Sequence, residues 1–171
     1  KGTRVATYSP SSFYDRDLKV DGPPGQRLAQ LQAIYDGAPV GLCLLDTETR
    51  YVSINRRLAD MNGAPAEQHI GRTPAEIIPP VFSQVGHYIR LALDGNVVEG
   101  VEIRKPSSNG AQGRTLLASY RPVRDEAGEV LGVSIAVMDI TESRRAEESL
   151  REMEEHYRTL LRLNPHVPWV L

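Results

Sequence analysis

Between residues 131 and 160 the sequence passes from a strand pattern to a helix pattern without a break. Residues 131–138 form an apolar run rich in β-branched side chains, which is typical of a central strand covered on both faces. From Asp139 to Leu163 there is no glycine or proline, so a helix can begin where the strand ends. We therefore predict a core strand joined directly to a long helix, an arrangement suited to passing a structural change out of the core.

The predicted helix carries a start signal and a dimer seam. Asp139 and Glu142 have the spacing of a capping box, and Thr141 is a second possible cap. Small or apolar residues then recur every three or four positions, which is the a/d pattern of a coiled coil: Ser143, Ala146, Leu150, Met153, Tyr157, Leu160 and Asn164. We predict a homodimer through this helix, with Leu150, Met153, Tyr157 and Leu160 at its centre.

Composition narrows the class of protein and its partners. The chain has 171 residues, of which 40% are hydrophobic and 25% charged, as expected of one globular domain with appendages. A net charge of −2 gives no reason to expect nucleic acid or an anionic membrane as a partner. The single cysteine, Cys43, suits a reducing compartment. With no leader sequence and no membrane-length apolar run, the cytoplasm is the simplest location, although a longer parent protein with a membrane segment stays possible.

The first half of the chain predicts two strands and several small helices. Residues 1–26 read as an arm or linker, and residues 27–36 as a short amphipathic helix. Strands at 41–46 and 50–54 form a hairpin whose second strand points Val52 and Ile54 inward. Asn55 caps a helix that ends at Asn62-Gly63, and residues 64–80 hold only short helical turns.

The second half predicts one longer helix and three longer strands. The helix covers residues 81–94, and the strands cover about 97–104, 114–124 and 129–140. Together the elements predict an α+β fold, with a five-stranded antiparallel sheet, helices on one face and a cavity between the two layers. The C-terminal coiled-coil helix is added to this core.

Five short segments resemble the running motifs of PAS sensory domains: Ala38-Pro39-Val40-Gly41-Leu42, Leu45-Asp46, Tyr51-Val52-Ser53-Ile54-Asn55, Ile70-Gly71-Arg72-Thr73 and Asp139-Ile140-Thr141. The resemblance covers residues 27–141, and the order and spacing of the motifs make it specific. It implies a ligand or cofactor cavity, dimerisation, and a position upstream of an output domain such as a sensor histidine kinase or a diguanylate cyclase. It also implies that Asp139 and Thr141 couple the last strand to the outgoing helix.

The end of the chain resembles the opening of a second PAS domain, through Tyr157-Arg158-Thr159-Leu160-Leu161, Asn164-Pro165 and Pro168-Trp169. We therefore expect the PAS domain to be followed by a signalling helix at residues 142–163. Residues 164–171 would then begin a following domain, and the chain would be a fragment of a longer protein.

The apolar faces of the predicted elements define a candidate ligand pocket. Tyr120 alternates with Leu116 and Ala118 on its strand and could offer a hydroxyl group to a ligand. The residues expected to line the pocket are Val52, Ile54, Leu58, Met61, Ile70, Ile77, Val85, Ile89, Tyr120, Val133 and Ile135.

The sequence disfavours heme and a photoactive flavin, and it leaves any other cofactor unknown. Heme-binding PAS domains take a histidine from the long helix, but His87 lies opposite the apolar stripe of that helix and should face water. His69, in the irregular segment, is a weaker candidate. The photoactive flavin subfamily needs a cysteine on a helix, whereas Cys43 lies in a predicted strand and reads as a small buried hydrophobe.

No catalytic motif or metal motif is visible, so we do not expect this chain itself to be an enzyme. His156 is followed by Tyr157 and lacks the acidic residue that follows the phosphoacceptor histidine of sensor kinases. The preferred interpretation is a sensory PAS module for a small ligand. Two alternatives stay open, a ligand-free dimerisation and spacer module and, less favoured, a heme or flavin sensor.

Overall fold

The structure is a computed structural model that describes residues 24–106 and 113–163. The chain divides into two compact units, residues 1–34 and residues 35–171. Helix α1 (Pro24–Gly37) spans the boundary. The other elements are β1 (Gly41–Asp46), β2 (Tyr51–Ile54), α2 (Arg56–Asn62), η2 (Ala66–Gln68), α3 (Pro74–Ile77), α4 (Pro79–Leu93), β3 (Val98–Lys105), β4 (Arg114–Arg124), β5 (Val130–Asp139) and α5 (Thr141–Leu163). The predicted start of a following domain, at residues 164–171, and most of the predicted arm lie outside the described residues.

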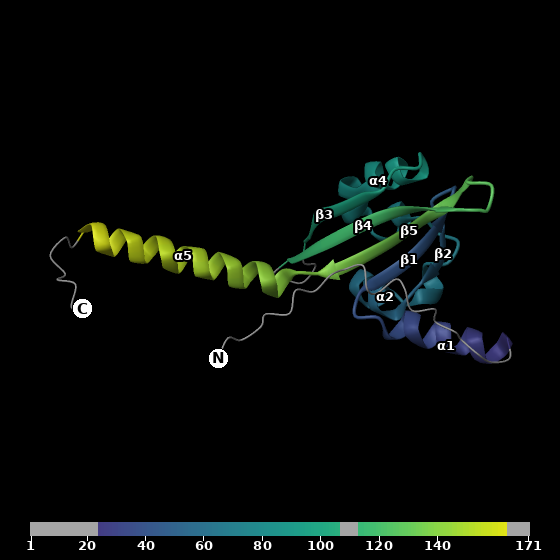
Figure 1. The fold of residues 1–171 in the computed structure, drawn as a ribbon, viewed down its shortest axis with the longest axis horizontal. Coiled ribbons are helices and arrows are strands. Elements are labelled where there is room, and N and C mark those ends of the chain that lie inside the picture. The colour runs from purple at the N-terminus through teal and green to yellow at the C-terminus, as the bar shows by residue number, and fades with distance from the viewer. Residues whose placement is uncertain (1–23, 107–112, 164–171) are drawn as a thin grey trace, which may run out of the picture. The chain divides into compact units, whose positions relative to one another are not determined.

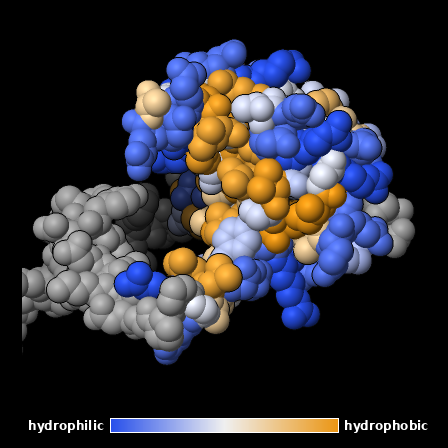
Figure 2. Space-filling model, turned by 90° about the vertical axis from the view of Figure 1, so that its right-hand side faces the viewer, coloured by the Kyte–Doolittle hydropathy of each residue, from blue (hydrophilic) through white to orange (hydrophobic). Residues whose placement is uncertain are grey.

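The second unit is built on one antiparallel five-stranded sheet with the strand order β2-β1-β5-β4-β3 (Figure 1). The predicted fold class is confirmed, and β5 is the central strand, followed directly by α5. The prediction that β5 is covered on both faces is wrong in part, because Ser134 and Met138, which alternate with its buried residues, are exposed, Met138 to 48%. Figure 2 shows apolar patches separated by polar side chains on one face of the molecule.

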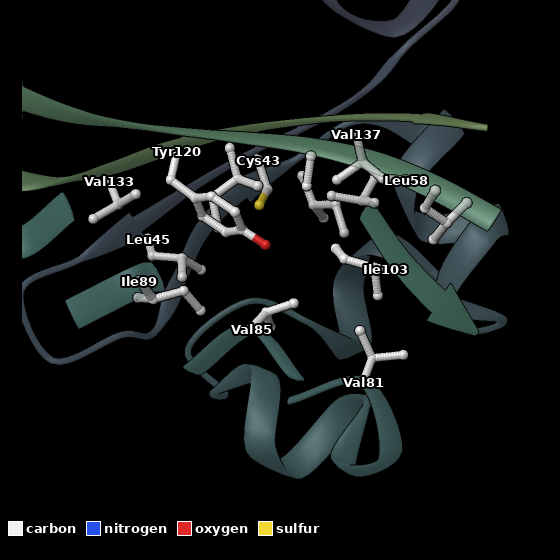
Figure 3. Packing of buried hydrophobic residues seen from close by; sticks show 14 of the residues in the cluster. Cys43, Leu45, Leu58, Val81, Val85, Ile89, Ile103, Tyr120, Val133 and Val137 are labelled. Carbon is white, nitrogen blue, oxygen red and sulfur yellow. The ribbon is translucent and has the colours of Figure 1, made fainter. Parts of the chain in front are cut away.

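The core lies between the sheet and the helices that pack on its inner face. Alternate residues of β4 are buried (Leu116, Ala118 and Tyr120), which is the period-two pattern of a half-buried strand. Helix α4 contributes Val81, Val85, Ile89 and Ala92 at helical spacing. Figure 3 shows the side chains of the strands and of α4 pointing toward one another, with the Tyr120 hydroxyl and the Cys43 sulfur between them.

Local chemistry fixes the starts of the two helices that bound the core. Asn55 caps α2 as predicted: its Oδ1 accepts from the Leu58 amide at 3.0 Å and from the Leu42 amide at 2.9 Å. Its Nδ2 donates to the Val40 carbonyl at 3.0 Å, so one buried side chain joins β1 to α2. Helix α4 starts at Pro79, two residues before the predicted start, because proline is well tolerated in the first helical turn.

A β-bulge overturns the predicted direction of Val52. In β2, Leu44 pairs with Ser53 and Leu45 pairs with Tyr51, so Val52 is an extra residue in the ladder. The bulge reverses the inward and outward alternation between Ile54 and Tyr51. Ile54 is therefore buried as predicted, but Tyr51 takes the second inward position and Val52 is 51% exposed.

Ile70 is also misplaced by the sequence prediction. It forms an isolated parallel bridge with Tyr51 at the edge of the sheet and is 50% exposed. The adjacent His69 turns inward and is fully buried. In a segment without regular alternation, hydropathy alone picked the wrong one of these two neighbours.

Candidate functional site

A small cavity of about 50 Å³ lies between the sheet and helices α3 and α4. Its wall is formed by strands β1, β2, β3, β4 and β5 and by residues of α2, α3 and α4. The lining residues are Cys43, Tyr51, Leu58, Asn62, Pro74, Ile78, Val81, Ile89, Ile103, Leu116, Ile135 and Val137. This is the ligand-pocket position that the sequence predicts, but it is much smaller than the roughly 300–1,000 Å³ of a drug-sized site.

The cavity wall is mostly aliphatic and carries no charged side chain among its lining residues. Its polar groups are the Cys43 thiol, the Tyr51 side chain and the Asn62 amide. Burial raises the pKa of the Cys43 thiol to about 12, and it also raises the pKa values of Tyr51 and the neighbouring Tyr120. At neutral pH the wall is therefore uncharged, and it can solvate a neutral molecule far better than an ion.

His69 is a buried polar residue beside the cavity whose role the sequence did not indicate. Its Nδ1 lies 2.9 Å from the Pro65 carbonyl oxygen, and because a carbonyl only accepts, Nδ1 must carry the hydrogen. Its Nε2 then accepts from the Asn62 amide nitrogen at 3.1 Å. The ring also contacts Tyr51 edge to face at 5.2 Å. Nδ1 thus anchors the ring to Pro65, Nε2 holds Asn62 in the wall, and the ring itself packs against Tyr51.

His87, the other histidine considered as a heme ligand, and Cys43 lie as their sequence positions indicated. His87 is exposed on α4, so it does not point into the cavity. Cys43 is buried in β1. Among the described residues, no group of three or more His, Cys, Asp or Glu side chains could hold a metal ion.

The predicted pocket residues fall into four sets. Leu58, Ile89 and Ile135 line the cavity; Ile54, Met61, Val85, Tyr120 and Val133 are buried in the core around it. Ile77 is partly buried against the core, and Val52 and Ile70 lie outside, as described above. Strand alternation could have found the missed residues Leu116 and Val137, but no local pattern indicates Asn62 or Pro74.

The second part of the candidate site is the junction between β5 and α5. The Asp139 carboxylate accepts hydrogen bonds from the Thr141 amide at 3.0 Å and from the Thr141 hydroxyl. Burial alone would raise the pKa of Asp139, but the bonds from Thr141 and the nearby charge of Arg114 outweigh it and lower the pKa. The predicted capping box is wrong in detail: α5 begins at Thr141, so Asp139 acts on the first helical residue and Glu142 is not its reciprocal partner.

Thr141 also ties the junction to the neighbouring strand. The Thr115 amide donates to Thr141 Oγ1 at 3.0 Å, and the Ile140 amide donates to the Thr115 carbonyl at 2.9 Å. The residues predicted to couple strand and helix therefore bond to both β5 and β4. This geometry allows a shift of either strand to reach the start of α5.

The predicted dimer seam is an apolar stripe on α5. Leu150, Met153, Tyr157 and Leu160 are between 51% and 67% exposed. They line one shallow groove along the helix, together with polar neighbours such as His156. The homodimer stays a prediction, for which this stripe is the candidate surface.

Comparison with known proteins gives one family and several similar structures. Residues 35–145 match the family model described as PAS fold. The chain is 28% identical over 146 residues to the uncharacterized protein y4lL of Sinorhizobium fredii; the match covers 82% of this chain but only 17% of that protein.

Two solved structures illustrate the similarity in fold. The PAS domain of Bordetella pertussis BvgS has a TM-score of 0.53 and 22% identity, covering 76% of this chain and 98% of that one. A Vibrio cholera VqmA–ligand–DNA complex has a TM-score of 0.59 and 22% identity, covering 67% of this chain and 51% of that one. No helix in the described part of the chain is long and apolar enough to cross a membrane.

Proposed function

Because this chain belongs to the PAS fold family, we propose that it is a sensory module that binds a small ligand in its core and passes the change to a further domain. The observation that carries this proposal is the continuity between cavity and helix. Ile135 and Val137 line the cavity on β5, and the same strand leads through Asp139 directly into α5. A change in the cavity therefore acts on the strand that positions the helix.

The volume and the chemistry of the cavity define the class of ligand. A space of about 50 Å³ holds one or two water-sized groups, given that a water molecule occupies about 30 Å³ in the liquid. The uncharged wall favours a neutral molecule of a few non-hydrogen atoms, with Tyr51 or Asn62 available for a hydrogen bond. Heme or flavin would require the helices to move away from the sheet, and both stay disfavoured.

The mechanism needs two arrangements of α5 that differ by only a few kcal/mol, so that a ligand can shift their populations. We infer that α5 forms a parallel two-fold coiled coil and that the ligand changes its direction or register. The output domain is proposed to be a kinase or a cyclic-dinucleotide enzyme, with this chain acting as a non-catalytic part. The small share of y4lL that the chain matches is compatible with such a longer parent protein.

The partners of the parent protein are less well defined. The expectation that no nucleic acid is bound rests on the net charge of −2 alone. The similar VqmA structure is a complex with DNA, so the comparisons give this expectation no support. We therefore propose only a second copy of the chain as the direct partner of α5.

The alternative function is a ligand-free dimerisation and spacer module. The small size of the cavity and the complete pairing of buried side-chain nitrogen and oxygen atoms in the described residues favour it. Under this alternative, the cavity would be a packing defect and α5 would only set the distance to the next domain.

Denaturing extraction of the purified protein, followed by mass spectrometry and an absorption spectrum, separates these functions. A stoichiometric small neutral molecule supports the sensory function. In parallel, xenon binding followed by methyl NMR tests whether the cavity can be occupied, with Val81→Phe as the filled-cavity variant and Val52→Phe as the exposed control. No bound molecule and no xenon-dependent shift of the Val81, Ile103 or Ile135 methyl signals would favour the spacer.

A further inference from the structure

Helix α5 is connected to the core at a second place, away from β5. We propose that Gln84, Glu102 and Arg144 are positioning residues that link α4, the helix over the cavity, to α5 through the edge strand β3. This inference rests on the proposed sensory function and adds a second route for the signal, parallel to the one through Asp139 and Thr141.

The first step of this link joins α4 to β3. The Gln84 side-chain Nε2 donates to the Arg104 carbonyl oxygen at 2.8 Å, and the Arg104 amide donates to Gln84 Oε1 at 3.1 Å. β3 lies at the edge of the sheet, so this amide takes the place that a neighbouring strand would occupy. In the sequence of α4, Gln84 lies between the cavity residue Val81 and the core residue Val85. A movement of α4 is therefore transmitted to the backbone of β3 through the hydrogen bonds of Gln84.

The second step joins β3 to α5. Glu102 lies two residues before Arg104, and its carboxylate contacts the guanidinium group of Arg144. The other terminal nitrogen of the same guanidinium group donates to Glu147 Oε2 at 2.8 Å. The side chains of Arg144 and Glu102 are 43% and 44% exposed. A planar guanidinium group held by carboxylates on both sides has a defined orientation.

The position of Arg144 in α5 explains how the link can control the direction of this helix. Thr141 fixes the start of α5 against β4, and Arg144 fixes it again nearly one turn later against β3. One attachment point leaves a hinge, whereas two attachment points on different strands define the direction of the helix. A polar groove of about 310 Å³ runs beside this second point, lined by Glu102, Arg104, Thr115, Arg144, Glu147, Glu148 and Arg151.

The expected strength of the Glu102–Arg144 ion pair is suited to an interaction that forms and breaks, rather than to a permanent attachment. A half-exposed ion pair contributes no more than about 1 kcal/mol, which corresponds to about a fivefold change in a two-state equilibrium. Loss of the pair should therefore redistribute α5 between directions without unfolding the core.

Spin labels at Glu126→Cys and Glu155→Cys, diluted with unlabelled protein, report the direction of α5 through double electron–electron resonance. Cys43 is buried and stays in place, because it forms part of the cavity wall. Arg144→Glu and Glu102→Arg should each change the ratio of the distance populations about two- to fivefold. The double exchange, Glu102→Arg with Arg144→Glu, should move the distribution back toward that of the parent protein. Restoration should be incomplete, because Glu147 then faces a carboxylate in place of the guanidinium group. Gln84→Ala should resemble the single charge reversals, and Arg158→Glu farther along α5 serves as the matched control.

Unchanged distances in both single reversals, or a double exchange no closer to the parent distribution than the single reversals, would overturn the link. So would a Gln84→Ala variant with the distances of the parent protein. None of these measurements needs a ligand in the cavity. Failure of the link is therefore distinguishable from failure of the sensory function, which the extraction and xenon experiments test.

Discussion

Gly132 lies on β5 opposite Asp46 of β1. A Cβ atom at this position would overlap the Leu45 carbonyl oxygen, a backbone atom that cannot move without disturbing the β1–β5 ladder. We expect Gly132→Ala to lower the free energy of unfolding by about 1–3 kcal/mol, the usual cost of overpacking. Urea denaturation measures the change, with Gly37→Ala as the control because a Cβ atom at residue 37 would have no neighbour within 4 Å. Equal effects of the two substitutions would contradict this account of β5.

Cys43 should make the protein sensitive to alkaline pH. Its pKa is raised by burial from an ordinary value of 9.0 to about 12, so the folded state keeps the thiol protonated while the unfolded state releases the proton. The stabilisation is complete below about pH 9 and is lost as the pH rises from there toward 12. We expect the free energy of unfolding to fall between pH 8.5 and about pH 10, before most tyrosines titrate.

Chemical denaturation of Cys43→Val at the same pH values tests this expectation. The variant has no thiol to ionise, so its stability should stay nearly constant over the range. Parallel curves for the variant and the parent protein would show that Cys43 is not the source of the pH dependence.

The residues that could be predicted from the sequence are positioned by local patterns, whereas those that could not are positioned by contacts with distant parts of the chain. Ile54, Leu58 and Ile89 follow from a regular period, which is a local property of the chain. Val52 is turned outward by a bulge that depends on its pairing with β1. His69 is buried because Pro65 and Asn62 supply its partners in the folded chain, and no period in the sequence indicates such a pairing.

At the scale of the secondary-structure elements, the β5–α5 junction is a joint held by the side chains of Asp139 and Thr141 and by the backbone hydrogen bond between Ile140 and Thr115. Periodicity was enough to predict every strand of the sheet within a few residues, and the Asn55 and Gly63 caps of α2 were predictable from residue type. The detail of the junction was not, because Asp139 lies at the end of a strand and bonds two residues ahead. The residue spacing of a capping box does not indicate at which residue a strand ends and the following helix begins.

Asp139→Ala should loosen this joint and leave the sheet intact. The lost capping interaction is worth about 1 kcal/mol, so hydrogen exchange should become roughly fivefold faster at the amides of Thr141 and Glu142. Amides of β4 and β5 should keep the rates of the parent protein, and the dimer should persist. Faster exchange throughout β5 would instead show that Asp139 stabilises the whole strand.

The same joint should respond to acid. The pKa of Asp139 is lowered in the folded state, so its stabilisation is present above the ordinary value of 3.8 and is lost as the pH falls through the lowered pKa. The hydrogen-exchange rates of the Thr141 and Glu142 amides in the parent protein and in Asp139→Ala should therefore become more similar below about pH 4. A difference that stays constant down to pH 2 would contradict a role for the carboxylate.

At the scale of the whole molecule, the apolar stripe of α5 is the surface on which we predict that a second copy of the chain packs. Leu150→Lys with Met153→Lys would remove two adjacent layers of the seam and place like charges opposite one another. Each buried apolar layer is worth a few kcal/mol, so we expect a monomer or a far weaker dimer with an unchanged core. Sedimentation measures the mass, and circular dichroism checks the fold.

Glu148→Gln with Glu155→Gln is the matched control, because it changes the net charge equally on the opposite face of α5. It should sediment as the parent protein does. If the Leu150/Met153 variant also does so, then α5 is not the dimer seam, and another surface such as α1, with its exposed Leu28, Leu31 and Ile34, would have to take that role.

The state of the cavity should set the position of α5, and a change of one methylene group can test this coupling directly. Val81→Ile adds that group to the cavity wall, which a space of about 50 Å³ can accept, and so imitates occupancy without a ligand. Val52→Ile adds the same group at an exposed position. Distances between labels at Glu126→Cys and Glu155→Cys are then compared, with thermal unfolding as the check that the cavity is filled. We predict that Val81→Ile raises the unfolding midpoint and shifts the distance distribution, while Val52→Ile does neither. A raised midpoint with the distances of the parent protein would contradict the coupling, because the cavity would then be filled without any effect on the helix.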